Sequence, residues 1–155
     1  MTVLSGQTIR RLKLLRPMRE KYFDRNGCSC GLSVAGYDIT IDHDAIFEPQ
    51  SFTLVAAAEQ FIMPTNVIGV VHDKSSLARK GIAVQNTVIE PGWRGFLTLE
   101  VTNHSSTRLS LREDDALGQV LFHFLDEPAE TPYHGKYQDQ NRGPQVPIRE
   151  NGSKL

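Results

Sequence analysis

The sequence predicts an all-β domain, built as a barrel or a sandwich. Short apolar runs recur along most of the chain and are separated by glycine, proline and asparagine, as is typical of short strands. Helical periodicity is confined to residues 6–15 and to one turn near residues 75–79. With 155 residues, the chain has the length of one domain with a substantial hydrophobic core.

The first expected element is a helix at residues 6–15, with Ser5 as its N-cap and Ile9 and Leu12 on its apolar side. Residues 25–31, RNGCSCG, are expected to form a loop. The last expected strand, GQVLFHFL, is apolar on both faces, which is typical of a fully buried strand. The expected strands are 35–41, 50–59, 60–64, 66–71, 81–89, 96–103, 107–111 and 118–125.

The segment KSSLARKG is expected to form the end of a strand followed by one helical turn. Ser75 or Ser76 would cap this turn, whose exposed backbone N–H groups would attract an anion. Arg79 lies one turn later on the same side, and Lys74 stands just before the cap. On these residues alone, the segment is either a phosphate-sized anion site or a capped turn with a solvated arginine.

The strand FLTLEVTN contains a carboxylate in an otherwise apolar setting. Alternation places Leu97, Leu99 and Val101 on the core face, so Thr98 and Glu100 are expected on the opposite, more polar face. Glutamate is disfavoured in strands, and a carboxylate held there can have a raised pKa and act as a general acid–base near neutral pH. The alternative is a solvated glutamate on an exposed strand face.

Between these two segments lies the turn EPGWRG. Glu90 precedes a Pro-Gly turn, so its carboxylate is expected at the end of a short strand, near a loop mouth. Trp93 is the only tryptophan and is expected to be a core anchor rather than a stacking platform.

Composition excludes several partners and compartments. A net charge of −1 and a pI of about 6.5 indicate no bulk attraction to nucleic acid or to a membrane. No apolar stretch is long enough to span a bilayer and no signal peptide is evident, which favours the cytoplasm. Cys28 and Cys30 are too close in sequence to favour a disulfide, and the scattered histidines show no zinc-ligand spacing, so no zinc is expected.

Several segments in order resemble the dCTP deaminases of the dCTP deaminase/dUTPase superfamily. These are DKSSLARKG, IEPGWRGFLTLEVTN, the strand DALGQVLFHFL and the closing segment PYHGKYQDQNRGPQ, while AGYDITI resembles a motif of the related dUTPases. The match covers residues 36–145. It implies a distorted jelly-roll (β-clip) barrel of the dUTPase-like type with a short N-terminal helix. It also implies a homotrimer with active sites at subunit boundaries.

The resemblance implies a deoxyribonucleoside triphosphate substrate bound with Mg²⁺, and hydrolysis of dCTP to dUTP and ammonia; dUTP and dTTP are further candidate ligands. Glu100 falls on the family's catalytic glutamate, which would move protons between water, cytosine N3 and the departing ammonia, and Arg79 and Ser75 join it as catalytic candidates. Asp38 is a candidate outer contact of the Mg²⁺, although a turn or strand-end role is equally open. Nucleotide contacts are implied at Lys74, Ser75, Ser76, Arg79, Glu90, Thr98, Leu99, Glu100, Tyr133, Lys136 and Gln140.

Two departures from the deaminase pattern keep alternatives open. The stretch between Arg79 and Trp93 is shorter than in deaminases and fits some dUTPases, in which Glu90 would replace the aspartate that orients water towards the α-phosphorus. The tail KYQDQNRGP instead resembles deaminases that also cleave the triphosphate to dUMP and pyrophosphate. A deaminase, a bifunctional deaminase–diphosphatase, a dUTPase and a nucleotide-binding regulatory trimer without turnover therefore all remain candidates.

From Asp126 onwards the chain becomes polar and proline-rich and cannot bury a core of its own. We therefore predict a barrel domain at residues 1–126 and a tail at 127–155. Tyr133, Lys136 and Tyr137 provide groups for stacking and for binding phosphate, which favours a lid that orders over bound nucleotide. A frayed tail is the alternative.

Overall fold

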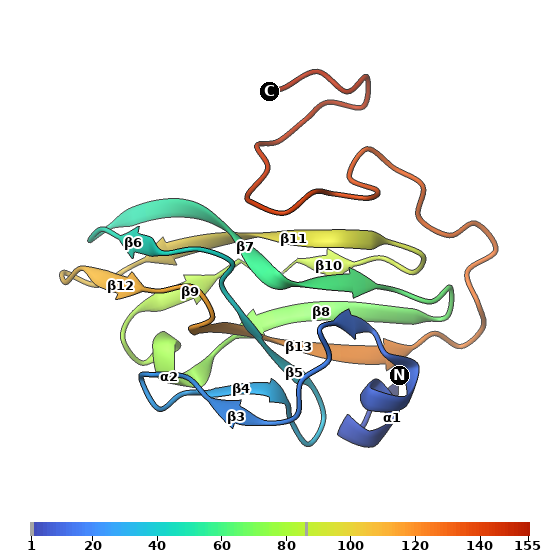
Figure 1. Ribbon diagram of the computed structural model, residues 1–155. Coiled ribbons are helices and arrows are strands. Elements are labelled where there is room, and N and C mark those ends of the chain that lie inside the picture. The colour runs from blue at the N-terminus through green and yellow to red at the C-terminus, as the bar shows by residue number, and fades with distance from the viewer. Residues whose placement is uncertain (1, 86) are drawn as a thin grey trace.

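The computed structural model describes residues 2–85 and 87–155, and its regular secondary structure is mostly strand (Figure 1). Two short helices accompany them, α1 (Gly6–Leu12) and α2 (Ser75–Ala78). The strands are β1 (Thr2–Val3), β2 (Leu15–Arg16), β3 (Tyr22–Phe23), β4 (Ser29–Leu32), β5 (Tyr37–Thr40), β6 (Ala45–Phe47), β7 (Ser51–Ile62), β8 (Val67–Asp73), β9 (Ile82–Val84), β10 (Val88–Ile89), β11 (Arg94–Asn103), β12 (Leu109–Leu111) and β13 (Ala116–Phe124). The predicted all-β class is confirmed.

The strands form two main sheets. One has the order β10-β8-β13-β5-β4-β3, with β1 added to β13, and the other has the order β2-β7-β11-β9. A separate pair joins β6 and β12. The strand pairs are antiparallel, and β13 lies in the middle of the larger sheet, as its apolar sequence predicts. Within the described residues, no helix has the length and apolar character needed to cross a membrane.

The core lies between the two main sheets. Phe61 on β7 is fully buried, and its ring packs against Phe122 of β13 at a centroid distance of 6.5 Å. The same ring packs against Trp93 at 6.3 Å. Trp93 is only 5% exposed, so its predicted role as a core anchor is confirmed. Phe61 therefore joins the two sheets and supports the turn that leads into β11.

Four predicted boundaries are wrong. The first helix ends at Leu12 instead of continuing to residue 15, because Lys13 takes a left-handed conformation and both Leu14 and Leu15 are fully buried. Two consecutive leucines can both be buried when the chain is extended, and Leu15 starts β2. The expected loop at 25–31 instead ends inside β4. The runs 50–59 and 60–64 form one strand, β7, while 81–89 is divided into β9 and β10; Asn86 lies outside the described residues.

The continuous strand β7 carries a buried carboxylate at Glu59, which is only 2% exposed. Both of its oxygens accept hydrogen bonds from Thr40 on β5, one from the backbone N–H and one from the hydroxyl, each at 3.1 Å. Burial raises the pKa of Glu59 from its ordinary value of 4.5 to about 7. This pair explains why the polar residue does not interrupt β7.

We expect Glu59→Gln to remove a pH dependence of stability. Because the folded-state pKa of Glu59 lies above its unfolded value, the folded protein binds more protons between about pH 4.5 and 7, and stability falls as the pH rises through that window. Glutamine can keep both contacts to Thr40 without the charge, because its oxygen accepts from the backbone N–H and its amide nitrogen donates to the hydroxyl oxygen. The gain in unfolding free energy should be small at pH 4.5 and reach about 3 kcal/mol above pH 7.

Urea unfolding of both proteins at several pH values would measure this difference. Glu127→Gln, on an exposed loop, is the matched control and should change stability equally little at every pH. A stabilisation by Glu59→Gln that is the same at pH 5 and at pH 8 would contradict the assignment.

Candidate active site

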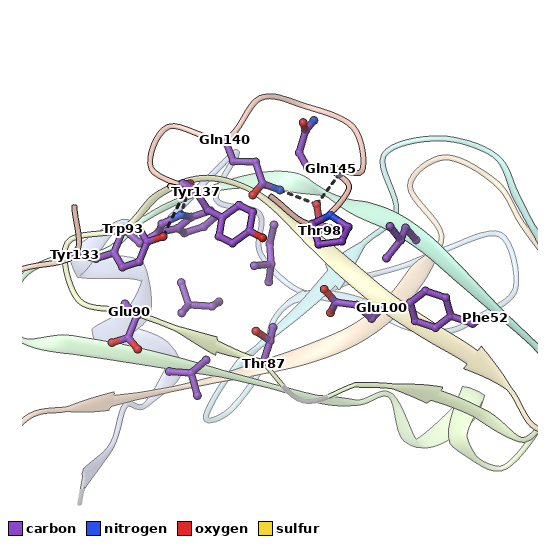
Figure 2. Close-up of a pocket in the computed structure, with 15 residues that line it drawn as sticks. Phe52, Thr87, Glu90, Trp93, Thr98, Glu100, Tyr133, Tyr137, Gln140 and Gln145 are labelled. Carbon is purple, nitrogen blue, oxygen red and sulfur yellow. Dashed lines mark hydrogen bonds between the residues drawn. The ribbon is translucent and has the colours of Figure 1, made fainter. Parts of the chain in front are cut away.

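A pocket of about 390 Å³ opens between β11, the β10 edge and the C-terminal tail (Figure 2). Its walls are mostly apolar, and a few polar groups converge on it, which is the usual composition of a small-molecule site. Its lining residues are Phe52, Leu54, Thr87, Val88, Ile89, Glu90, Trp93, Leu97, Thr98, Glu100, Tyr133, Tyr137, Gln140, Gln145 and Pro147.

Glu100 projects into this pocket from the middle of β11, near Phe52 (Figure 2). Its backbone is held on both sides, because it lies opposite Leu54 of β7 and its carbonyl accepts the N–H of Gln85 at 2.8 Å. The side chain is half-buried, and this burial raises the pKa of Glu100 above its ordinary value. The strand pattern therefore predicted both the face and the direction of the pKa shift.

A β-bulge changes the face of one neighbour. The register between β11 and β7 shifts between Phe96 and Thr98, so Leu97 and Thr98 both line the pocket. The prediction that Leu97 points wholly into the core is therefore wrong, because strict alternation fails at a bulge. Leu99 is fully buried, so only its backbone groups could make the predicted contact with nucleotide.

The tail lies along β11 (Figure 1). Five of its residues line one side of the pocket, Tyr133, Tyr137, Gln140, Gln145 and Pro147. The Trp93 indole N–H donates to the Tyr137 carbonyl at 2.7 Å. The Thr98 hydroxyl oxygen accepts two hydrogen bonds, from the Gln140 side chain at 2.6 Å and from the Gln145 backbone N–H at 2.9 Å. These contacts place the tail as a cover over the pocket.

Gly95 permits this close approach of the tail. It pairs with Gln140, and a Cβ atom at Gly95 would lie 2.7 Å from the Gln140 backbone nitrogen. Its φ of 152° is also unfavourable for other residues. A side chain at this position would therefore push the tail away from β11.

The predicted contacts divide into two groups. Glu90, Thr98, Glu100, Tyr133 and Gln140 all line the pocket, with Glu90 exposed near one end and Glu100 at the other (Figure 2). The remaining side chains lie outside the pocket. Lys136 forms an ion pair with Glu150 at 2.8 Å. The others are at α2 and form what is called here the α2 group: Lys74, Ser75, Ser76 and Arg79.

The α2 turn does not contribute to the pocket of its own chain. Ser75, Ser76 and Arg79 are exposed, and no pocket-lining residue comes from α2 in the part of the chain that the structure describes. The predicted serine cap is wrong: Lys74 is the N-cap, Ser75 is already helical, and no side chain caps the turn. Cys28, which is half-buried, places its sulfur 3.5 Å from the Ser76 hydroxyl.

The two cysteines are free, as their spacing predicts. Cys30 is fully buried, and this burial raises the pKa of its thiol to about 12.

Asp38 is committed to protein partners. Its carboxylate contacts the Lys74 ammonium at 3.1 Å, the Ser29 hydroxyl at 2.9 Å and the Gln119 amide at 3.1 Å. These contacts engage both carboxylate oxygens, and the outer contact to Mg²⁺ stays a prediction. Across residues 2–85 and 87–155, no group of three or more histidine, cysteine, aspartate or glutamate residues is placed to hold a metal ion.

Sequence reasoning missed part of the pocket wall. Phe52 and Leu54 lie on one face of β7, opposite Thr102 and Glu100 respectively. Their period-two spacing was visible in the sequence, but the strand that they would face was not. Gln145 and Pro147 had no distinguishing local signal, because their position depends on how the tail folds back.

The family model and the curated relatives that match this chain agree on one family. A family model described as dCTP deaminase-like matches residues 4–125. A dCTP deaminase of Chloroflexus aurantiacus is 33% identical over 176 residues, covering 90% of this chain and 95% of the relative. Among solved structures, a 2'-deoxycytidine 5'-triphosphate deaminase from Agrobacterium tumefaciens has a TM-score of 0.65 at 17% identity, over 79% of this chain and 48% of that one. A native EIAV dUTPase has a TM-score of 0.57 at 19% identity, over 77% of this chain and 94% of that one. These structural matches support the jelly-roll-like fold.

Proposed function

Because the chain belongs to the dCTP deaminase-like family, we propose that it is an enzyme that hydrolyses dCTP to dUTP and ammonia. The observation that carries this proposal is the position of Glu100, a half-buried carboxylate whose pKa is raised inside the pocket. A carboxylate with a raised pKa can both accept and return protons near neutral pH.

The proposed chemistry needs one acid–base group. Glu100 accepts a proton from water as the water oxygen bonds to cytosine C4, and passes this proton to N3 as the C4–N3 double bond becomes single. Glu100 then takes the proton of the new C4 hydroxyl and delivers it to the amino group, which leaves as ammonia while the C4–O bond becomes the carbonyl of uracil. With nucleotide filling the pocket, the mostly apolar walls would limit the access of bulk water and strengthen these transfers.

We further propose that the working unit is a homotrimer in which α2 of one subunit completes the pocket of another. The support is that Ser75, Ser76 and Arg79 are exposed on α2 and outside the pocket of their own chain. Exposed hydroxyl, N–H and guanidinium groups suit a triphosphate. Mg²⁺ would be carried by the triphosphate oxygens and would neutralise their charge.

A second activity is favoured by one observation. Glu90 lines the same pocket as Glu100 but lies towards the other end, where it could orient a second water (Figure 2). A bifunctional enzyme would then continue from dUTP to dUMP and pyrophosphate. A dUTPase alone, or a binding protein without turnover, are the remaining candidates.

Incubation with dCTP and with dUTP, with ammonia and pyrophosphate followed separately, distinguishes these activities. Ammonia from dCTP is the expected result, and pyrophosphate in addition indicates the bifunctional enzyme. Pyrophosphate from dUTP without ammonia from dCTP would identify a dUTPase. The absence of both products would identify a binding protein and reject the proposed function.

We expect Arg79→Ala to lower kcat/KM for dCTP by at least about tenfold, because the exposed guanidinium would lose its contact with phosphate. Steady-state kinetics would measure this change. The matched control is Arg108→Ala, which removes a surface ion pair with Glu48 at 2.9 Å and should leave kcat/KM nearly unchanged. Equal losses in the two variants would count against the α2 site.

A further inference from the structure

The Lys74 side chain is enclosed, unlike the rest of the α2 group. The residue is 9% exposed, and its ammonium contacts the Asp38 carboxylate at 3.1 Å and the Ser29 hydroxyl at 2.9 Å. An ammonium has three N–H donors, and two protein groups, the Asp38 carboxylate and the Ser29 hydroxyl, contact this one. Ser75, Ser76 and Arg79, by contrast, are exposed.

The acceptor side of this pair is equally fixed. Asp38 is 4% exposed and lies on β5, where its carboxylate also accepts hydrogen bonds from Ser29 of β4 and from Gln119 of β13. Three neighbouring strands of the larger sheet thus hold one carboxylate, and that carboxylate holds Lys74. Removing one partner of a desolvated pair leaves an uncompensated charge, so the pair resists separation.

The same residue starts the helical turn. The Lys74 carbonyl accepts the N–H groups of Leu77 at 2.9 Å and Ala78 at 2.8 Å. No side chain caps the turn, so the usual means of fixing a helix start is not used at α2. The buried contact between Lys74 and Asp38 is therefore the side-chain anchor at the point where the turn begins.

We propose that Lys74 is a positioning residue rather than a phosphate ligand, and that its pair with Asp38 sets the orientation of Ser75, Ser76 and Arg79 towards the triphosphate. This inference rests on the proposed function, and it assigns Asp38 a role in holding Lys74. The anion site would then consist of the exposed α2 groups, with the buried pair beneath them.

The two roles predict different results when the counter-ion is changed. If Lys74 positions the turn, Asp38→Asn and Lys74→Met should each lower kcat/KM for dCTP at least tenfold, mainly through KM. The double variant should then be no worse than the poorer single variant, because both changes break one unit. If Lys74 binds phosphate directly, Asp38→Asn would free the ammonium and leave kcat/KM unchanged or higher, which would overturn the proposal. Unchanged activity in Lys74→Met would also overturn it.

One further variant, and the double variant, keep the test independent of folding. Ser29→Ala removes one acceptor of Lys74 without leaving a buried charge, and it should raise KM several-fold. Circular dichroism at the assay temperature shows whether each variant is folded. In the double variant, Lys74→Met with Asp38→Asn, both charges are removed together. If the Ser29→Ala variant and the double variant are both folded and both keep the wild-type KM, the proposal is overturned.

A binding measurement separates failure of this proposal from failure of the proposed function. Inorganic tripolyphosphate is the ligand, and the shift in melting temperature that it causes is recorded for all variants. If the wild-type protein releases no ammonia but tripolyphosphate stabilises it, the proposed function fails. The positioning role of Lys74 and Asp38 is still tested by the shift in melting temperature. In that case the shift should be lost in both Asp38→Asn and Lys74→Met. Its retention in Asp38→Asn would overturn the positioning role.

Discussion

Replacing Glu100 with glutamine is expected to lower kcat for ammonia release from dCTP by about 10²- to 10⁴-fold. Glutamine keeps the size of the side chain but cannot accept a proton from the attacking water. Nucleotide affinity should persist, because Phe52, Leu54, Thr98 and the other walls of the pocket are unchanged. The variant should therefore bind dCTP but convert it far more slowly.

The pH dependence of the wild-type enzyme provides a second measurement of Glu100. The carboxylate must be ionised to accept the proton from water, so kcat/KM should fall as the pH drops through its pKa. Because burial raises that pKa, the fall should lie above the range of an ordinary glutamate.

Glu90→Gln is the matched control, because Glu90 lines the same pocket towards its other end. It should preserve ammonia release while lowering any pyrophosphate release. Ammonia release at wild-type rates from Glu100→Gln would refute the acid–base role of Glu100.

The largest expected loss of stability follows from Phe61→Ala. Phe61 is fully buried between Phe122 and Trp93, and removing its ring would leave a cavity between the two sheets. Such a substitution costs about 3–5 kcal/mol, which corresponds to about 6–20 °C in Tm for a chain of this length. Denaturant unfolding at one fixed protein concentration would measure it, since the proposed trimer would make stability depend on concentration.

Two variants bracket this value. Phe61→Leu keeps most of the apolar volume and should cost less than about 1.5 kcal/mol. Phe23→Ala removes a phenylalanine that is 66% exposed and should change stability by about 0.5 kcal/mol or less. If Phe61→Ala cost no more than Phe23→Ala, the description of the core would be wrong.

Local sequence pattern predicted most strands and the face of Glu100, because alternation along a strand is a local property. It failed at Leu97, where a bulge changes the register, since a bulge depends on the pairing of β11 with β7. The end of the first helix was missed for a similar reason. Leu14 and Leu15 leave the helical pattern because the core buries both.

The pocket and the α2 group show the same limit at longer range. Glu90, Thr98, Tyr133 and Gln140 were found through family motifs, whereas Phe52 was missed because its partner strand is distant in sequence. The burial of Lys74 also depends on distant residues, since Asp38 approaches it only once the strands have paired.

The contrast between the two cysteines gives the chain a natural attachment point for a fluorescent dye. A thiol-reactive reagent requires accessible thiolate, and Cys30 offers little of it because it is fully buried and its thiol pKa is about 12. Cys28 is partly accessible and lies beside Ser76. A maleimide dye should therefore label Cys28 selectively, and its emission would report on ligands arriving at α2 without any change to the sequence.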